Sequence, residues 1–124
     1  MDLIPRSIGE VVVLAPAGRL DHESVEDFRS ALQPQLDLAF ATGRAVLFDL
    51  SALEYVSSAG LRCFMLAAKQ AKAKNGRLAV AGPQPVVAEI LEISRFNMVF
   101  RIFPKVPEAL AFLSAGAGAA IGRG

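Results

Sequence analysis

The sequence predicts an α/β domain, a compact fold in which about four helices pack on a mixed, largely parallel sheet of about four or five strands. Three observations predict this class. Short apolar runs with the composition of strands alternate with helical patterns along the chain. Turn residues, above all Pro and Gly, separate successive patterns. Apolar residues make up 53% of the 124 residues, which is enough for the core of one domain.

The first strands are expected between Glu10 and Leu20. Pro16 interrupts them, because proline has no N–H to donate to a neighbouring strand, so a sheet edge or a turn is expected there. A helix should follow. Ser24, with Asp27 three residues later, has the form of a capping box at its start.

The first helix is predicted from apolar residues that recur every three or four positions, namely Val25, Phe28, Leu32, Leu36 and Phe40. Pro34 lies inside this pattern. It is expected to kink or interrupt the helix, because proline removes a backbone donor and clashes with the preceding turn.

A near-continuous apolar run from Ala45 to Leu50 predicts a central strand that is covered by helices. A second helix should then run to about Ala73, where Asn75 and Gly76 give a C-cap signal. The buried face of this helix is predicted to hold Leu61, Phe64, Met65, Ala68 and either Ala71 or Lys72.

Two more strands and two more helices complete the predicted domain. Residues 77–81 and 99–103 are expected to be strands. Pro85 suits the first position of a third helix, and residues 104–113 should form the last one. The chain is expected to divide into an N-terminal extension, the domain itself and a Gly/Ala-rich flexible tail, at residues 1–7, 8–113 and 114–124.

Charge and hydropathy exclude several classes of protein. With 13 basic residues, 12 acidic residues and no run of Lys or Arg, the chain is not expected to bind nucleic acid directly. No apolar run reaches the roughly 18 residues that span a bilayer, and no signal-peptide core is evident. We therefore expect no membrane insertion and a cytoplasmic location.

Catalytic and metal chemistry is not predicted, because Cys63 is the single cysteine and His22 the single histidine. A packing role is expected for Cys63 and a local polar or capping role for His22. The carboxylates Asp21, Asp49 and Glu54 either cluster near the end of the central strand or form a solvated rim. We expect no enzyme activity and no cofactor.

The most informative segment begins after the central strand and opens the second helix. Ser57 is predicted to be the N-cap of this helix and Ser58 its first residue. At such a helix start the first N–H groups have no partner and the dipole is positive, so a phosphate is tolerated. A pair of small capping residues without any modification is the alternative that spacing leaves open.

The segment Leu53-Glu54-Tyr55-Val56-Ser57-Ser58-Ala59-Gly60-Leu61-Arg62 resembles the signature segment of STAS domains, the family of bacterial anti-sigma factor antagonists. In that family the serine two positions before the glycine is phosphorylated, which here is Ser58. The family's frequent Asp before it is replaced by Ser57, and the Ser or Thr after it by Ala59. Residues 18–21, Gly-Arg-Leu-Asp, are similar to the family's G-x-L-D motif, and the resemblance covers about residues 8–113.

This resemblance implies a phosphorylation-controlled partner switch in transcription regulation. The unphosphorylated chain would bind an anti-sigma factor that is also a serine kinase with a histidine-kinase-like ATPase fold, and a sigma factor or another regulator would be released. Phosphorylation of Ser58 would end the binding, and a PP2C-type serine phosphatase would reverse it. ATP would belong to the kinase. The implied partner-binding residues, expected on one exposed edge, are Asp21, Ser57, Ser58, Gly60 and Arg62.

Other functions stay open from the sequence. One is a structural or regulatory STAS module that is never phosphorylated, in a lipid-transport or sensory complex. Another is a small hydrolase with Ser58 as nucleophile, although the G-x-S-x-G pattern is absent. For Asp21, a helix cap is the alternative to a role in kinase recognition.

Overall fold

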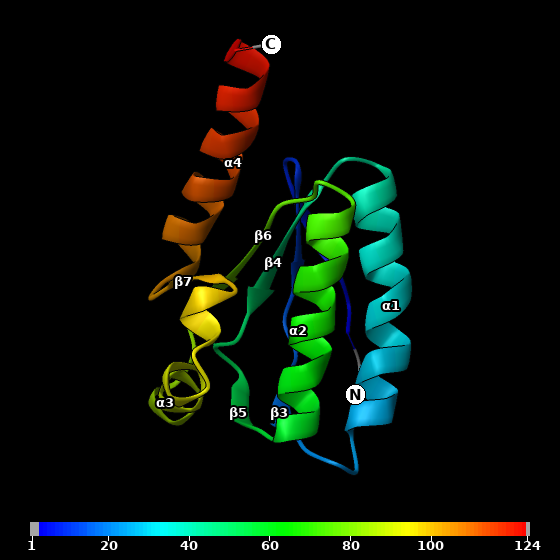
Figure 1. Cartoon of the computed structure of the whole chain (residues 1–124), viewed down its shortest axis with the longest axis vertical. Coiled ribbons are helices and arrows are strands. Elements are labelled where there is room, and N and C mark those ends of the chain that lie inside the picture. Colours follow the sequence, from blue (N-terminus) through cyan, green and yellow to red (C-terminus); the bar gives the residue numbers. More distant parts are fainter. Residues whose placement is uncertain (1–2, 124) are drawn as a thin grey trace.

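The structure, a computed structural model, describes the backbone of residues 3–123 and the side chains of residues 3–114 (Figure 1). The strands are β1 (Arg6–Ile8), β2 (Val11–Leu14), β3 (Gly18–Leu20), β4 (Ala45–Asp49), β5 (Leu53–Val56), β6 (Leu78–Ala81) and β7 (Arg101–Phe103). The helices are α1 (Val25–Ala41), α2 (Ser58–Ala73), α3 (Pro85–Ile93) and α4 (Val106–Arg123), with a short 3₁₀ helix, η1 (Phe96–Met98).

Five strands form the main sheet in the order β1-β2-β4-β6-β7, and β3 pairs with β5 in a small separate sheet. Strand β1 runs antiparallel to β2, whereas the other pairings among the described strands are parallel. The predicted fold class is therefore confirmed: a mixed, largely parallel sheet of five strands with four helices.

The central strands β2, β4 and β6 are buried on both faces, because successive side chains point to opposite sides. One face packs into the core beneath α1, α2 and α3, through Val12, Leu14, Val46, Phe48 and Val80. The other face packs against Ala109 and Leu113 of α4, through Val11, Val13, Ala45, Leu47, Ala79 and Ala81. Burial on both faces explains why these strands are almost continuously apolar in the sequence.

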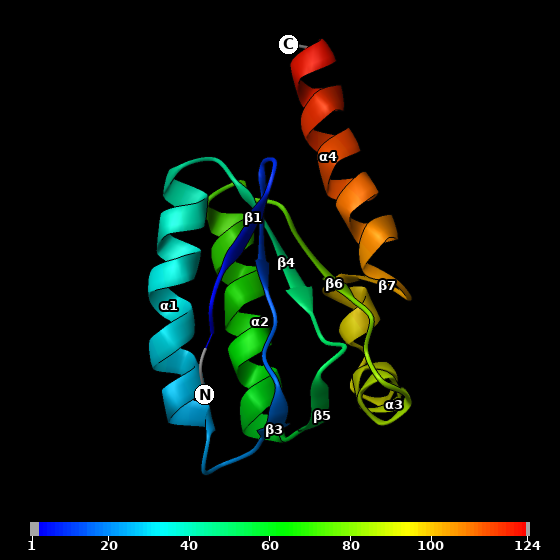
Figure 2. The ribbon, with the colours of Figure 1, turned by 180° about the vertical axis from the view of Figure 1, so that it is seen from behind.

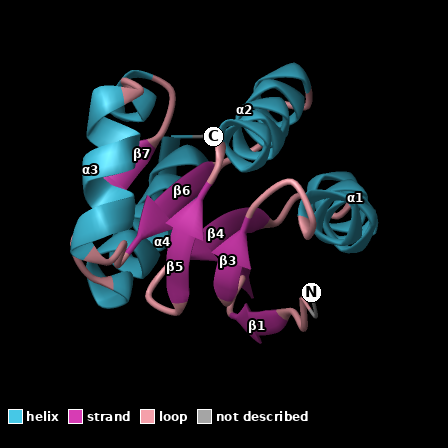
Figure 3. Cartoon of the chain, turned by 90° about the horizontal axis from the view of Figure 1, so that it is seen from below, coloured by secondary structure: helices cyan, strands magenta, loops and turns pink. Residues whose placement is uncertain are grey.

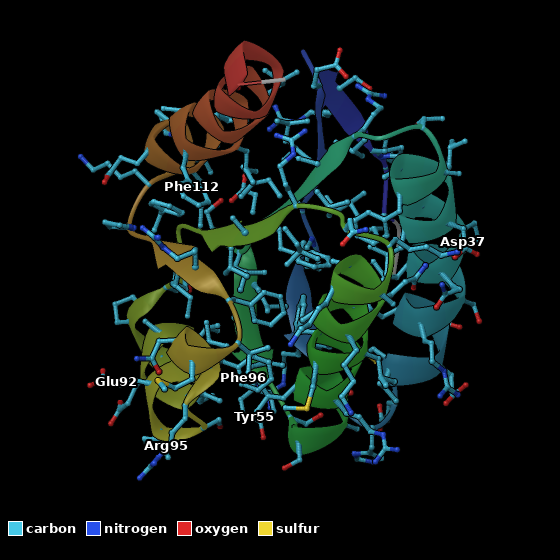
Figure 4. All side chains as sticks on the ribbon, turned by 45° about the horizontal axis from the view of Figure 1, so that its top comes forward. Asp37, Tyr55, Glu92, Arg95, Phe96 and Phe112 are labelled. Atoms are coloured by element: carbon cyan, nitrogen blue, oxygen red, sulfur yellow. The ribbon has the colours of Figure 1, made fainter. Side chains whose placement is uncertain are left out.

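The helices are divided between the two faces of the sheet. Helices α1 and α2 lie side by side over one face, and α4 lies over the opposite face (Figures 1 and 2). Seen from below, α3 lies beside β5 and β7, at the other end of the row of strands from α1 (Figure 3). Oδ1 of Asp37 accepts hydrogen bonds from the amides of Gln33 at 2.9 Å and Gln70 at 2.7 Å, which links α1 to α2 (Figure 4).

Helix α1 begins without the capping box predicted for Ser24 and Asp27. Ser24 precedes the helix, but its side chain makes no capping hydrogen bond. Its hydroxyl instead donates to the carbonyl oxygen of Arg19 at 2.8 Å and accepts from the N–H of Asp21 at 3.0 Å. The prediction is wrong because the chain that precedes the helix already engages this hydroxyl.

Two details of the long helices differ from expectation. Helix α1 continues without a break through Pro34. The buried residues Leu32 and Leu36 on either side anchor it to the core, which offsets the backbone hydrogen bond that proline removes. In α2, Cys63 packs in the core as predicted, while three residues of the expected buried face are only partly buried: Leu61, Met65 and Ala68.

Strands β1 and β5 are absent from the predicted elements. All three residues of β1 are exposed, so they carry no apolar pattern. The opening hairpin is β1–β2, with Gly9 at φ +58° in its turn, and β3 belongs to the small sheet. Arg6 and the buried Leu3 thus take part in the fold although they lie in the stretch assigned to an extension. The domain limits of residues 8 and 113 stay a prediction.

Helix α4 extends further than expected. It continues to Arg123, where an irregular tail was predicted from residue 114. The alanines in this stretch have the highest helix propensity of any residue, which favours continuation of the helix. The guanidinium of Arg77 donates to the carbonyl oxygen of Leu113, so the described part of α4 is tied to the start of β6. Within the described residues, no helix is both long and apolar enough to cross a membrane.

Candidate functional site

Ser57 is the N-cap of α2, as predicted. Its backbone is extended, at φ −84° and ψ 174°, and its hydroxyl oxygen accepts a hydrogen bond from the N–H of Gly60 at 3.2 Å. Its carbonyl oxygen accepts from the N–H of Leu61 at 2.9 Å. The Ser57 side chain therefore satisfies one of the donors that a helix start leaves without a partner.

Ser58 is the first residue of α2, and it is exposed. Among the side-chain hydrogen bonds of the described residues, none uses the Ser58 hydroxyl. The positive end of the helix dipole lies here, and the first turn contains no acidic residue. Of the two serines, Ser58 therefore has the accessible hydroxyl, in surroundings that favour a phosphate.

The Gly-Arg-Leu-Asp motif of residues 18–21 and the serine motif that begins at Ser57 meet where β3 and β5 end. These strands are parallel, with Leu20 opposite Val56. The N–H of Ser57 donates a hydrogen bond to the carbonyl oxygen of Leu20 at 2.8 Å. Since Asp21 directly follows Leu20, this bond brings the end of the Gly-Arg-Leu-Asp motif to the start of the serine motif.

Gly60 is buried, so its expected exposure is wrong. A Cβ atom at this position would lie 2.8 Å from Cγ of Leu20 and 2.9 Å from Cγ2 of Val56. The glycine thus lets α2 approach β3 and β5. The expectation failed because residues of one contiguous motif do not share one surface on a helix of 3.6 residues per turn.

Asp21 is half-buried, and its carboxylate stabilises the turn before α1. Oδ1 accepts hydrogen bonds from the N–H of Glu23 at 3.0 Å and the N–H of Ser24 at 3.3 Å. The hydrogen bond from Glu23 is the main cause that lowers the pKa of Asp21, and the bonds from Ser24 act in the same direction. These contacts give Asp21 a local role in the turn before α1, whose N-cap is Ser24, while its role in recognition stays a prediction.

Arg19 lies beside both Tyr55 and Asp21, and neither Arg19 nor Tyr55 is among the predicted site residues. The guanidinium carbon of Arg19 lies 4.4 Å from the centre of the Tyr55 ring, and its Nε lies 3.9 Å from Oδ2 of Asp21. Tyr55 lies close to the start of α2 (Figure 4). The pairing of β3 with β5 sets Arg19 opposite Tyr55. No local pattern in the sequence signals this contact, because it depends on the pairing of two strands that are distant along the chain.

Ser58 and Arg62 line the same surface hollow, which has a volume of about 410 Å³. The other residues of this hollow are apolar and come from α2 and η1: Ala59, Leu61, Met65 and Phe96. Arg62 is exposed and follows Ser58 by one helical turn, so the two side chains lie on the same face of α2. Arg62 is therefore well placed to approach a phosphate on Ser58.

The remaining carboxylates do not form a cluster with Asp21. Oδ1 of Asp49 accepts from the N–H of Ser51 at 3.0 Å and from its hydroxyl at 2.7 Å, which closes a local turn. Glu54 is exposed on β5. No hydrogen bond or ion pair between described residues joins these three, which favours the solvated rim. In the described part of the chain, no group of three or more His, Cys, Asp or Glu residues could hold a metal ion.

Comparison with known proteins agrees with this arrangement of motifs. The family model described as the STAS domain matches residues 3–109. The chain is also similar to BtrV of Bordetella bronchiseptica, which is provisionally named an anti-sigma factor antagonist. The two are 33% identical over 102 residues, which make up 82% of this chain and 85% of BtrV.

Solved structures share the fold at lower identity. A provisionally named anti-sigma factor antagonist from Thermotoga maritima has a TM-score of 0.81 at 19% identity and covers 90% of this chain and 94% of its own. The anti-sigma factor antagonist SpoIIAA in its unphosphorylated form has a TM-score of 0.72 at 20% identity, with coverage of 92% and 97%. SpoIIAA of Bacillus in the phosphorylated form has a TM-score of 0.63 at 20% identity, with coverage of 88% and 96%.

Proposed function

The chain belongs to the STAS domain family, and on that premise we propose that it is a phosphorylation-controlled anti-sigma factor antagonist. With Ser58 unmodified, it binds an anti-sigma factor that is also a serine kinase with a histidine-kinase-like ATPase fold. The sigma factor, or another regulator held by that kinase, is then released. Phosphorylation of Ser58 ends the binding, and a PP2C-type serine phosphatase restores it. The chain acts in the cytoplasm as substrate and binding partner and needs no catalytic group of its own.

The difference between the two neighbouring hydroxyl groups carries this proposal. The Ser57 hydroxyl is engaged with the N–H of Gly60, whereas the Ser58 hydroxyl is exposed and makes no side-chain hydrogen bond among the described residues. The names of similar proteins support the same class, because BtrV is named an antagonist and SpoIIAA has been solved both with and without phosphate.

The phosphoryl transfer needs only an accessible hydroxyl from this chain. Oγ of Ser58 forms a bond to the γ-phosphorus of ATP, the bond from that phosphorus to the bridging oxygen breaks, and ADP leaves. The hydroxyl proton passes to a base on the kinase. The product suits the start of α2, because the helix dipole stabilises a nearby negative charge by about 0.3–1 kcal/mol. Arg62 supplies a further positive charge one turn away.

The charge added by phosphorylation then weakens binding of the partner. A phosphoserine carries about 1.5 to 2 negative charges at neutral pH. If it meets a carboxylate of the partner at about 4 Å, the repulsion near a protein surface is on the order of 4 kcal/mol. That energy corresponds to an affinity loss on the order of a thousandfold. The switch acts at the surface and does not require the domain to refold.

Some residues around Ser58 are proposed to contact the partner, and others hold that surface in place. Asp21, Ser57 and Arg62 are at least partly accessible near the start of α2, and we assign them to the partner surface. Gly60 is buried and supports this surface by bringing α2 close to the small sheet. Arg19 holds the carboxylate of Asp21 from one side while its guanidinium stacks on an aromatic ring.

The test is phosphorylation of the purified chain in an extract of its source cells supplied with ATP, read by intact mass and phosphopeptide mapping. We expect one added phosphoryl group, on Ser58. Ser58→Ala should remove it, and Ser57→Ala should keep it. If the wild-type chain gains no phosphoryl group while the phosphorylation of other proteins in the extract proceeds, the chain is the alternative, a STAS module that works without phosphorylation.

A further inference from the structure

A continuous groove leads away from Ser58 along α2. It consists of three hollows that share lining residues. The hollow at Ser58, of about 410 Å³, shares Met65 with a second of about 360 Å³. The second shares Val99 with a third of about 240 Å³. Helix α2 forms one wall, and residues 96–100 form the other; Phe96 lies between α3 and α2 (Figure 4).

The wall opposite α2 exposes large apolar side chains. Met98 is 80% exposed and Val99 is 45% exposed, although both line the groove. Apolar side chains that gather along a groove mark an interaction surface, whereas single ones scattered over a protein do not. Methionines suit such a surface, because their flexible side chains adapt to a partner. Met65 faces Met98 and Val99 as part of the same hollow.

The rim of the groove is basic along α2. Arg62 lines the first hollow, Lys69 the second, and Lys72 the second and third, and all three residues are exposed. Among the described residues, no acidic side chain lines any of these hollows. An apolar groove with one basic wall is complementary to a helix that carries an apolar stripe with acidic residues along one side of it.

We propose that this groove binds an amphipathic helix of the partner protein, with Asp and Glu residues on the side of its apolar stripe that faces α2. From Ser58 to Lys72, α2 rises by about 21 Å at about 1.5 Å per residue, which is the length of about four helical turns. The inference rests on the proposed function, because it gives the partner that contacts Ser58 a second contact region. Its test does not require the kinase.

Phosphorylation is coupled to this groove through Arg62. Ser58 lies at one end of the groove, and Arg62 lines the same hollow. A phosphate on Ser58 pairs with Arg62 and adds negative charge at the mouth of the groove. An acidic helix then loses one of its cations and meets repulsion at the same place, so its affinity falls about tenfold or more.

The experiment titrates two synthetic helical peptides into the full ¹⁵N-labelled chain and records amide shifts. Both peptides have the same apolar stripe, and their other positions are mostly Glu in one and Lys in the other. We expect the acidic peptide to shift the amides of residues 58–72 and 96–100. The basic peptide should bind at least tenfold more weakly. Combining Lys69→Glu with Lys72→Glu should weaken the acidic peptide about tenfold.

Matched variants locate the binding site. Met98→Glu should abolish the shifts, whereas Leu38→Glu should not, because Leu38 is also largely exposed, at 64%, but lies on α1 outside the groove. Equal binding of both peptides, or equal loss in both variants, would overturn the proposal. Shifts of the same amides when the chain alone is concentrated would also overturn the proposal, because they would show that a second copy of the chain binds in the groove. If the unmodified chain does not bind the acidic peptide but is phosphorylated on Ser58 in the extract, the groove proposal alone is rejected. If it binds the acidic peptide but gains no phosphoryl group in the extract, the proposed function alone is rejected.

Discussion

The N–H of Ser57 donates a hydrogen bond of 2.8 Å to the carbonyl oxygen of Leu20. Through this bond the N-cap of α2 is fixed to the end of β3. The side chain of Leu20 also lies against Gly60, in the first turn of α2. Both the backbone and the side chain of Leu20 therefore hold the helix start that presents Ser58. A change at Ser58 should alter the surface and leave this support in place.

The first prediction is that Ser57 and Ser58 contribute differently to the stability of the fold. Ser57→Ala removes the oxygen that accepts from the N–H of Gly60, so the free energy of unfolding should fall by about 1 kcal/mol. Ser58→Ala removes an exposed hydroxyl that makes no side-chain hydrogen bond among the described residues, so stability should change by less than about 0.5 kcal/mol. Urea unfolding of both variants checks this. A larger loss in Ser58→Ala than in Ser57→Ala would show that the two roles are exchanged.

The second prediction concerns Gly60. In Gly60→Ala the new methyl group meets Leu20 and Val56 at distances that force them to shift. Such overpacking costs about 1–3 kcal/mol, and the better helix propensity of alanine offsets up to about 1 kcal/mol of it. Urea unfolding should therefore show a net loss. The loss should shrink in a Leu20→Val background, and an unchanged loss there would mean that the contact with Leu20 is not its cause.

The third prediction is a pH dependence from Asp21. Its pKa is lowered from 3.8 in the folded chain, so the unfolded chain binds the proton more readily. The contribution of this carboxylate to stability is complete above about pH 5 and is lost as the pH falls through the folded pKa. Asp21→Asn keeps an oxygen that can accept the same hydrogen bonds but does not titrate. Its Tm should fall less than that of the wild type between about pH 5 and about pH 3, and an equal fall would contradict this.

The fourth prediction tests whether Asp21 also recognises the kinase. Near neutral pH, Asp21→Asn should lower Tm only slightly, because asparagine keeps an oxygen that can accept from the N–H groups of Glu23 and Ser24 and loses only the contribution of the charge. Kinase affinity should drop several-fold through loss of the charge at the edge of the interface. Calorimetric titration against the purified kinase measures it. If the affinity is unchanged, Asp21 serves only the local turn.

The elements with strong apolar patterns could be predicted from the sequence. Strand β4 is buried on both faces and α2 has clear start and end signals, so both were expected close to their observed limits. Strand β1 could not be predicted in this way, because Arg6, Ser7 and Ile8 are all exposed and form a strand by pairing with β2. Only part of the site could be predicted, because some of its features follow from the local sequence and others from tertiary packing. The role of Ser57 as the N-cap of α2 follows from local chemistry, whereas the burial of Gly60 depends on how α2 packs against the small sheet.

Contacts between distant segments account for the other differences. The stacking of Arg19 on Tyr55 requires the pairing of β3 with β5, which no local pattern specifies. The hydroxyl of Ser24 is engaged by the carbonyl oxygen of Arg19 and not by its helix, although its spacing with Asp27 resembles a capping box. Tertiary contacts decided the outcome in both cases.

The central claim is that phosphorylation of Ser58 acts by local charge and not by refolding. The most direct measurement compares the phosphorylated and unphosphorylated chains by amide NMR, together with a binding titration against the kinase. We expect amide shifts confined to the start of α2 and the end of β3, and an affinity loss on the order of a thousandfold. Ser58→Asp should reproduce part of that loss, since it carries less charge. Widespread shifts through the main sheet, or an affinity that does not change, would contradict the account.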